Sequence, residues 1–199
     1  PYTTLFRSQE TKKVNISDLP QREIETRFIE KHLFPSANVL EVGCGNGFLS
    51  QRIAKHVKSV DAFDYSENMV SQAKDVHAAD NIFYFNDNAL NPTSIPKNNY
   101  DVIICVRVLI NLKNIEQQKS AIQNLVEFMG PNTKLIIIEG FADGFENLNR
   151  LREAVAIEPL EPAKINFYSA LNDVLEFYLN PKLPPRAPKS ITWRGEQGW

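Results

Sequence analysis

The sequence predicts an α/β fold: a doubly wound, mainly parallel sheet with helices on both faces. Short apolar runs alternate along the chain with longer segments whose apolar residues recur at helical spacing. The apolar runs are continuous rather than alternating, which indicates strands that helices bury on both faces. A glycine-rich turn at residues 43–47 follows the first of these runs and precedes a helical segment.

The apolar runs predict five strands, at residues 38–42, 59–63, 82–85, 100–106 and 134–139. Between and before them, helices are predicted at residues 19–33, 48–56 and 67–76, with Ser66 as the N-cap of the last. A further helix carries Ile115, Ile122 and Met129 on one face, and we expect Gly130-Pro131 to end it.

Both ends of the chain look irregular. Residues 1–16 show no usable pattern, and four prolines lie within residues 181–188, so we expect a domain at 17–180 between an irregular N-terminal segment and an irregular tail at 181–199. Because the chain begins with Pro1, we expect a fragment or a processed product.

Composition narrows the classes of partner. A formal net charge of -2 gives no general attraction to nucleic acid, and no apolar run approaches the roughly 20 residues that span a bilayer. Cys44 and Cys105 lie in apolar surroundings without the spacing of a zinc site. We therefore expect a cytoplasmic protein with buried thiols, no bound metal, and neither a nucleic-acid nor a membrane partner.

The strongest chemical signal is the segment from Glu41 to Gly47, at the carboxyl end of the first predicted strand. Its glycines permit a sharp turn and let a ligand approach the backbone. Asp64 ends the second strand, where a carboxylate can accept hydrogen bonds from both ribose hydroxyls of an adenosine ligand. Asp61 is the competing acid but lies earlier in the strand. Asp87 follows the third strand, where it could accept from an adenine amine.

Together, the strings NVLEVGCGNGFLSQRIAK, DAFDYSENMVSQAK, NDNAL and YDVIICVRVLINL resemble class I, Rossmann-like S-adenosylmethionine-dependent methyltransferases over residues 20–140. The resemblance implies that Glu41 and the 43–47 turn lie under the methionine part of S-adenosylmethionine, that Asp64 holds the ribose, and that Asp87 with Asn88 reads the adenine. The implied cofactor site comprises Glu41, Gly43, Cys44, Gly45, Asn46, Gly47, Asp64, Tyr65, Asp87, Asn88, Ala89 and Val106.

A narrower resemblance covers the later region. GFENLNRLREAVAIEPLEP followed by NFYSALNDVLEFYL is similar to methyltransferases of bacterial surface-polysaccharide and other small-molecule pathways, which carry an LNxLR element and a WHN-type element. Residues 148–152 match the first element and residues 166–168 occupy the second, although Ile165 replaces its His and no Trp is near. We expect Asn166 and Tyr168 of the second element to bind the acceptor, and Arg152 to bind an anionic acceptor, because its planar guanidinium group suits a carboxylate or phosphate.

Methyl transfer is an in-line displacement, so the protein mainly aligns acceptor, methyl group and sulfur, and a general base is needed only where the acceptor must lose a proton. Arg107 and Asn111 follow the fourth strand and Glu139 ends the fifth, which makes these three the catalytic candidates. The three histidines, His32, His56 and His77, are expected at the surface, away from the strand ends.

The predicted function is methyl transfer to an oxygen or nitrogen of a small-molecule acceptor, with a sugar or surface-polysaccharide precursor as one class. Two alternatives stay open. A nicotinamide-dependent oxidoreductase would use the same fold, although the turn reads GxGxG rather than GxGxxG. The chain could also be a cofactor-binding but inactive fragment or scaffold, because the family's closing antiparallel strand pair has no counterpart after Asn180. Only residues 189–193 could form a strand there, so we expect C-terminal strands that are missing or altered.

Overall fold

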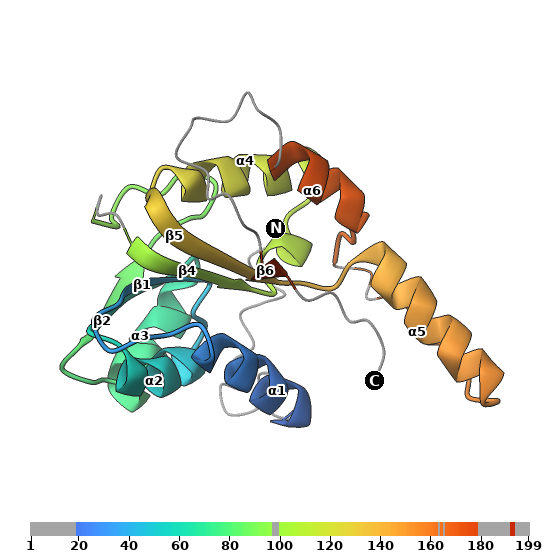
Figure 1. Ribbon diagram of the computed structural model, residues 1–199, viewed down its shortest axis with the longest axis horizontal. Helices are drawn as coiled ribbons and strands as arrows, with labels where there is room; N and C mark the ends of the chain where they lie inside the picture. Colours follow the sequence, from blue (N-terminus) through green and yellow to red (C-terminus); the bar gives the residue numbers. More distant parts are fainter. Residues whose placement is uncertain (1–18, 97–99, 163, 165, 179–191, 194–199) are drawn as a thin grey trace. The chain divides into compact units, whose positions relative to one another are not determined.

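The computed structural model describes residues 19–96, 100–162, 164, 166–178 and 192–193. The chain divides into two compact units, one made of Pro1–Asn88 with Thr93–Pro96 and the other of Ala89–Pro92 with Lys97–Trp199. In each unit, helices and strands alternate along the chain (Figure 1).

The first unit is built on three parallel strands. Its elements are α1 (Leu19–Glu30), β1 (Asn38–Val42), α2 (Phe48–Ile53), the 3-10 helix η3 (Ala54–His56), β2 (Ser59–Asp64), α3 (Glu67–Val76) and β3 (Ile82–Asn86). β2 lies between β1 and β3, with Glu41 opposite Ala62 and Asp64 opposite Asn86. Val39, Leu40 and Val60 are fully buried, as expected for strands that are covered by helices.

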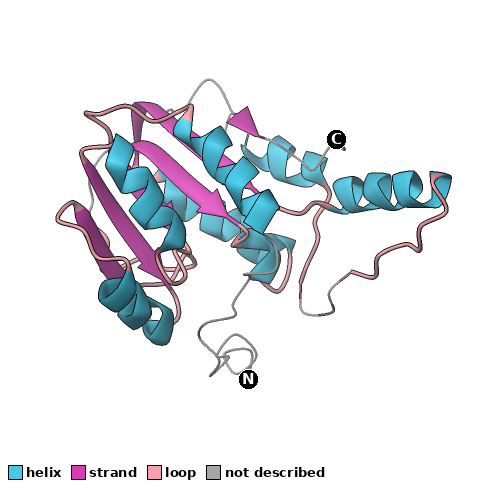
Figure 2. Cartoon of the chain, turned by 90° about the horizontal axis from the view of Figure 1, so that it is seen from below, coloured by secondary structure: helices cyan, strands magenta, loops and turns pink. Residues whose placement is uncertain are grey.

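The second unit also has parallel strands. Its elements are β4 (Tyr100–Val106), the 3-10 helix η4 (Leu109–Asn111), α4 (Ile115–Val126), β5 (Met129–Ile138), α5 (Ala142–Ala154), α6 (Leu171–Tyr178) and β6 (Thr192–Trp193). β5 pairs with β4 and with β6. α4 and α6 lie side by side over one face of this sheet, whereas α5 extends away from the rest of the unit without a buried residue (Figures 1 and 2).

These pairings confirm the predicted class, a doubly wound, parallel α/β fold of the Rossmann-like type. Most predicted elements agree with the structure to within a few residues. The first helix ends at Glu30 rather than near residue 33, and the segment predicted as one helix at 48–56 consists of α2 followed by η3. Ser66 caps α3 as predicted, since its hydroxyl accepts a hydrogen bond from the N–H of Met69.

The predicted end of the fourth helix is wrong. α4 ends at Val126, and Gly130-Pro131 lies inside β5, where Met129 is fully buried. A proline is tolerated there because its ring is exposed and the ladder shifts register between Tyr100 and Val102. The buried Thr133 hydroxyl accepts from the Gly130 N–H at 2.7 Å and donates to the Tyr100 carbonyl, which replaces the lost ladder bonds.

The chain beyond α6 is described only at β6. Thr192–Trp193 lies within the predicted 189–193 strand and pairs in parallel with β5, Thr192 opposite Ile136. Among the described residues, this short strand stands in place of the antiparallel pair expected of the family. The remainder of the predicted tail at 181–199, the segment 1–16, and Ile165 lie outside the described residues.

Candidate cofactor and acceptor sites

The turn after β1 has the backbone shape that its glycines predict. Gly43, Gly45 and Gly47 have φ angles of 71°, 55° and 82°, in the left-handed region that favours glycine. The N–H groups of Gly43 and Cys44 both donate to the Phe63 carbonyl, at 2.8 and 2.9 Å. The turn is therefore held against the end of β2.

Asp64 lies against this turn. Its Oδ2 accepts the Gly45 N–H at 2.9 Å, and its Oδ1 accepts the Ser66 N–H at 2.8 Å. Burial raises the pKa of Asp64, and the two backbone donors oppose that rise. The structure thus brings together two of the predicted cofactor-binding residues, Gly45 and Asp64. The competing acid, Asp61, lies in mid-strand opposite Leu40.

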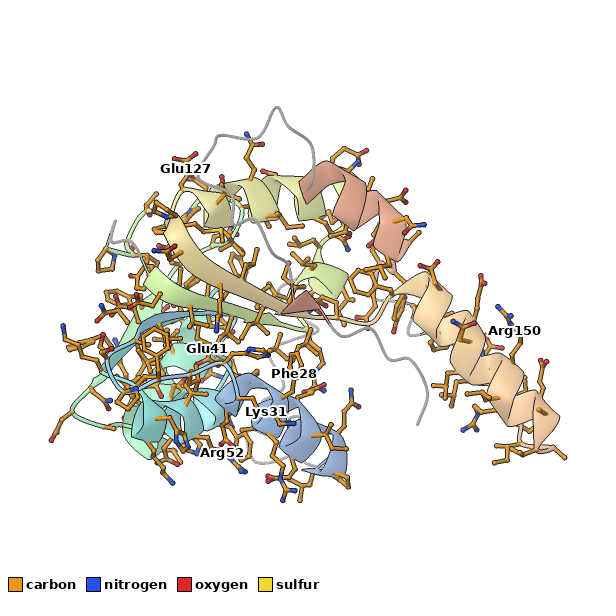
Figure 3. The ribbon with its side chains drawn as sticks, viewed as in Figure 1. Phe28, Lys31, Glu41, Arg52, Glu127 and Arg150 are labelled. Atoms are coloured by element: carbon orange, nitrogen blue, oxygen red, sulfur yellow. The ribbon has the colours of Figure 1, made fainter. Side chains whose placement is uncertain are left out.

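Glu41 is almost fully buried at the end of β1, inside the first unit (Figure 3). Its Oε2 accepts a hydrogen bond of 2.5 Å from the Ser50 hydroxyl on α2. Burial raises the pKa of Glu41 to about 8, against the lowering effect of Ser50 and with a further rise from Asp64. Glu41 is therefore largely protonated at neutral pH in this state, a property that the sequence did not reveal.

Asp87 accepts hydrogen bonds from the loop that follows β3. Its carboxylate accepts the N–H groups of Asn88, Thr93, Ser94 and Ile95 at 2.6 to 3.2 Å, so it holds the loop after β3 closed. Since a carboxylate offers about four acceptor sites, an adenine amine would have to share one that a backbone amide already uses. Tyr65, beside Asp64, leaves 60% of its surface exposed.

In the second unit, Glu139 binds the turn that follows β4. Its Oε1 accepts the N–H groups of Val108 at 2.6 Å and Leu109 at 2.7 Å, and its Oε2 accepts that of Ile110 at 3.4 Å. Burial raises the pKa of Glu139 to about 8, opposed by these donors and by Arg107. Glu139 therefore holds the turn that contains η4, and its catalytic role stays a prediction.

The other two catalytic candidates lie at the two ends of the turn that contains η4: Arg107 precedes it and Asn111 is its last residue. Arg107 has a φ of 54°, an uncommon conformation for a residue with a side chain. Its N–H donates to the Ile138 carbonyl at 2.8 Å, and its carbonyl accepts from the Asn111 side chain at 2.7 Å. Val106 ends β4 directly before it, and the Ala89 carbonyl accepts from the Asn124 side chain.

Asn166 and Tyr168, on either side of Phe167 in the sequence, contact each other through their side chains. The Asn166 amide donates to the Tyr168 hydroxyl at 3.1 Å, and the Phe145 and Tyr168 rings lie 5.7 Å apart. A Cβ on Gly140 would meet the Tyr168 ring at 3.1 Å, so glycine permits this approach. The neighbouring Phe167 is held by its N–H to the Ile110 carbonyl and by the Gln118 amide.

Arg152 is not grouped with these residues. Its Nε donates to the Glu158 carbonyl at 2.8 Å, which ties the end of α5 to the loop that follows. In Figure 3, the neighbouring Arg150 points outward from the projecting helix. The acceptor-binding role of Arg152 stays a prediction.

Comparison with known proteins identifies the domain. Residues 39–132 match the family model described as a methyltransferase domain. This stretch, a little under half of the chain, is therefore similar to a methyltransferase domain. The glycine turn, Asp64 and Asp87 of this methyltransferase domain all lie within the matched residues.

Individual relatives are distant. The mitochondrial ubiquinone biosynthesis O-methyltransferase of Schizosaccharomyces pombe is 28% identical over 114 residues, which cover 55% of this chain and 40% of that protein. The N-methyltransferase NodS of Bradyrhizobium japonicum, solved with S-adenosyl-L-homocysteine, has a TM-score of 0.60 at 23% identity over 68% of this chain and 71% of that one. The magnesium protoporphyrin IX methyltransferase of Synechocystis, also with bound S-adenosylhomocysteine, has a TM-score of 0.58 at 23% identity, covering 79% and 68%.

The chain spans less than half the length of the curated ubiquinone biosynthesis O-methyltransferases that it matches. Both cysteines of the methyltransferase domain are buried free thiols, as predicted. Within the described residues, no helix is both long and apolar enough to cross a bilayer, and no group of three or more acidic, His or Cys side chains is placed to hold a metal ion.

Sequence reasoning missed His77, which it placed at the surface. Its Nδ1 lies 2.7 Å from the carbonyl oxygen of Asn46, in the glycine turn of the methyltransferase domain. The contact joins residues 31 positions apart, and no local pattern signals it. Gln118 was missed for the same reason. Its buried side-chain amide donates to the carbonyl groups of Leu109 and Phe167, and so joins η4 to the segment before α6.

Proposed function

We propose that this chain transfers the methyl group of S-adenosylmethionine to an oxygen or nitrogen of a small-molecule acceptor. The observation that carries the proposal is the Asp64 carboxylate, held on the Gly45 N–H within a matched methyltransferase domain. A carboxylate fixed at the end of the second strand is suited to accept two ribose hydroxyls. Because the N–H groups of Gly45 and Ser66 already hold this carboxylate in place, ligand binding requires little rearrangement of the turn.

We assign the methionine part of the cofactor to Glu41 and the 43–47 turn, the ribose to Asp64, and the adenine to the Asp87-Asn88 segment. Tyr65 is suited to cover the adenosine because its ring is exposed beside Asp64. When bound, the cofactor supplies a methyl group on a positively charged sulfur, which is an excellent leaving group. The protein's own contribution is therefore orientation of the acceptor.

For the acceptor we assign Asn166 and Tyr168, with Arg107 and Asn111 at the turn after β4. The Tyr168 hydroxyl accepts from Asn166, so its own proton remains available to donate to an acceptor oxygen. The Phe145 and Tyr168 rings offer a flat apolar surface beside that hydroxyl. Glu139 is a positioning residue, because its carboxylate holds η4 through three backbone amides.

This combination of a ring surface and a hydroxyl favours a flat acceptor that carries hydroxyl groups. The names of the matched ubiquinone biosynthesis O-methyltransferases support an oxygen acceptor, and the resemblance to surface-polysaccharide enzymes supports a sugar hydroxyl. Both are oxygen acceptors, whereas the similarity to NodS supports nitrogen. The apolar setting of both cysteines supports a cytoplasmic location.

Calorimetric titration of the purified chain with S-adenosylhomocysteine tests the cofactor assignment. We expect the Asp64→Ala variant to lose at least about tenfold in affinity, because charge-assisted hydrogen bonds contribute roughly 1.5–3 kcal/mol each. Asp101→Ala, which removes a partly exposed acid at the start of β4, is a control expected to bind like the wild type. A folded wild-type chain that does not bind would contradict the proposal.

Methyl transfer itself is tested with S-adenosylmethionine carrying a radiolabelled methyl group and a panel of catechols, sugars and amines. Label that enters a catechol or sugar, and falls with Tyr168→Phe, supports the acceptor assignment. Cofactor binding without transfer to any member of the panel would favour the alternative of an inactive, cofactor-binding fragment.

A further inference from the structure

His77 reaches the glycine turn from the far end of α3. It is the C-cap residue of that helix, and its Nδ1 lies 2.7 Å from the Asn46 carbonyl oxygen. A carbonyl oxygen only accepts hydrogen bonds, so Nδ1 must carry the proton and donate. The ring also packs edge-on against Phe48, the first residue of α2, with centroids 6.5 Å apart.

The backbone of His77 is held in turn by Tyr84 on β3. The Tyr84 hydroxyl donates to the His77 carbonyl at 3.0 Å. The contacts from Tyr84 through His77 to Asn46 therefore form a partial ring around Gly47.

Gly47 fits tightly inside this ring. A Cβ at that position would lie 2.5 Å from the Tyr84 oxygen and 3.0 Å from the Ala73 side chain. The N–H of Gly47 donates to the Cys44 carbonyl at 3.0 Å, while the Asn46 carbonyl, on the same peptide group, accepts from His77. The Asn46-Gly47 peptide is thus held at both of its polar atoms, which fixes the orientation of its plane.

We propose that His77 is a positioning residue of the cofactor site, whose imidazole fixes the Asn46-Gly47 peptide in the orientation that S-adenosylmethionine requires. This inference rests on the proposed function, because it assumes that the turn binds the cofactor. His77 does not touch the ligand. It acts through the backbone of Asn46, by removing conformations of the turn that binding would otherwise have to exclude.

Two substitutions separate hydrogen bonding from packing. His77→Phe retains an aromatic ring against Phe48 but removes the donor, whereas His77→Asn retains an N–H donor near the Nδ1 position. We expect His77→Phe to raise the dissociation constant for S-adenosylhomocysteine about fivefold to tenfold, the effect of one hydrogen bond, and His77→Asn to restore it to within about twofold. His56→Phe, at an exposed histidine away from the turn, is the matched control.

Calorimetry is combined with urea unfolding of each variant. Loss of affinity in His77→Phe, with rescue in His77→Asn at equal or lower stability, supports a positioning role. Equal affinity in wild type and His77→Phe would overturn it. If the folded wild-type chain binds no S-adenosylhomocysteine, the proposed function fails and this inference fails with it, an outcome distinct from the previous one.

A spectroscopic measurement on the wild-type chain tests the inference without any substitution. The ring ¹⁵N chemical shifts of His77 should report a proton on Nδ1 and should change when S-adenosylhomocysteine is added. Those of His56 should not change. A His77 ring protonated only at Nε2 would contradict the hydrogen bond and the proposal.

Discussion

The side chain of Asn149 and the backbone of Leu160 exchange two hydrogen bonds: Nδ2 donates to the Leu160 carbonyl at 3.0 Å, and the Leu160 N–H donates to Oδ1 at 2.8 Å. Together with the bond from Arg152 to Glu158, this pair closes the loop after α5 back onto the helix. Asn149 and Arg152 of the LNxLR element therefore both make hydrogen bonds to the loop that follows their own helix.

Asn149→Ala should loosen residues 155–160 without weakening cofactor binding. We expect faster amide hydrogen exchange in that loop and a loss of unfolding free energy of about 1 kcal/mol or less, because the pair is exposed. Asn149→Asp keeps the acceptor for Leu160 and should lie between Ala and wild type. An Asn149→Ala chain that exchanges like wild type would show that the pair contributes no order, and Arg150→Ala is the control.

Thr133→Val should destabilise the second unit. The substitution keeps the shape of the side chain but leaves the Gly130 N–H and the Tyr100 carbonyl without their partner inside the protein. We expect a loss of about 2–4 kcal/mol in the free energy of unfolding by urea. Thr133→Ser, which retains the hydroxyl, should lose less than Thr133→Val. The reverse order would mean that methyl packing, rather than the hydrogen bonds, fixes the start of β5.

The features that were predicted correctly from the sequence are those set by residues close together in the chain. The positive φ angles of the 43–47 turn, the position of Asp64 at a strand end and the Ser66 cap each depend on a few neighbouring residues. The start of β5 was missed because Gly130-Pro131 resembles a helix stop, and only the contact between Thr133 and Tyr100 overrides that signal. His77 was missed because its partner, Asn46, is remote in sequence.

Gly47→Ala should reduce both stability and cofactor affinity. The new Cβ would meet the Tyr84 oxygen at 2.5 Å, and a φ of 82° strains any residue with a side chain. We expect a loss of about 1–3 kcal/mol in unfolding free energy. Adding Tyr84→Phe removes the oxygen but leaves the backbone strain, so the double variant should recover part of the loss. If the double variant is no more stable than Gly47→Ala, the whole loss of unfolding free energy comes from backbone strain at residue 47 and none from the contact with the Tyr84 oxygen.

Stability should fall as the pH rises from about 4.5 to 8. Burial raises the pKa values of Glu41 and Glu139 from 4.5 to about 8, so across this range the folded chain binds more protons than the unfolded chain. The stabilisation is complete below the unfolded pKa and is lost as the pH passes the folded pKa. The slope is at most about 1.4 kcal/mol per pH unit for each group, and Asp64, whose pKa burial also raises, acts in the same direction.

Urea unfolding at pH 5, 6, 7 and 8 measures this slope. Glu41→Gln and Glu139→Gln resemble the protonated carboxyls, so each should flatten the profile, and Glu127→Gln, at an exposed site, should leave it unchanged. A wild-type profile that is flat or rises over this range would contradict the expected protonation of the two buried groups.

The freedom of α5 has an evolutionary consequence. Because none of its residues is buried, substitutions along the helix do not disturb a packed interior, although Asp143 and Phe145, near its base, contact Leu171 and the Tyr168 ring. Such an arm can diverge between descendants of one ancestor, or be exchanged between them, while the parallel strands beneath it stay the same. Variation among close homologues should therefore concentrate beyond Phe145, and a chimaera that carries a foreign arm should still fold.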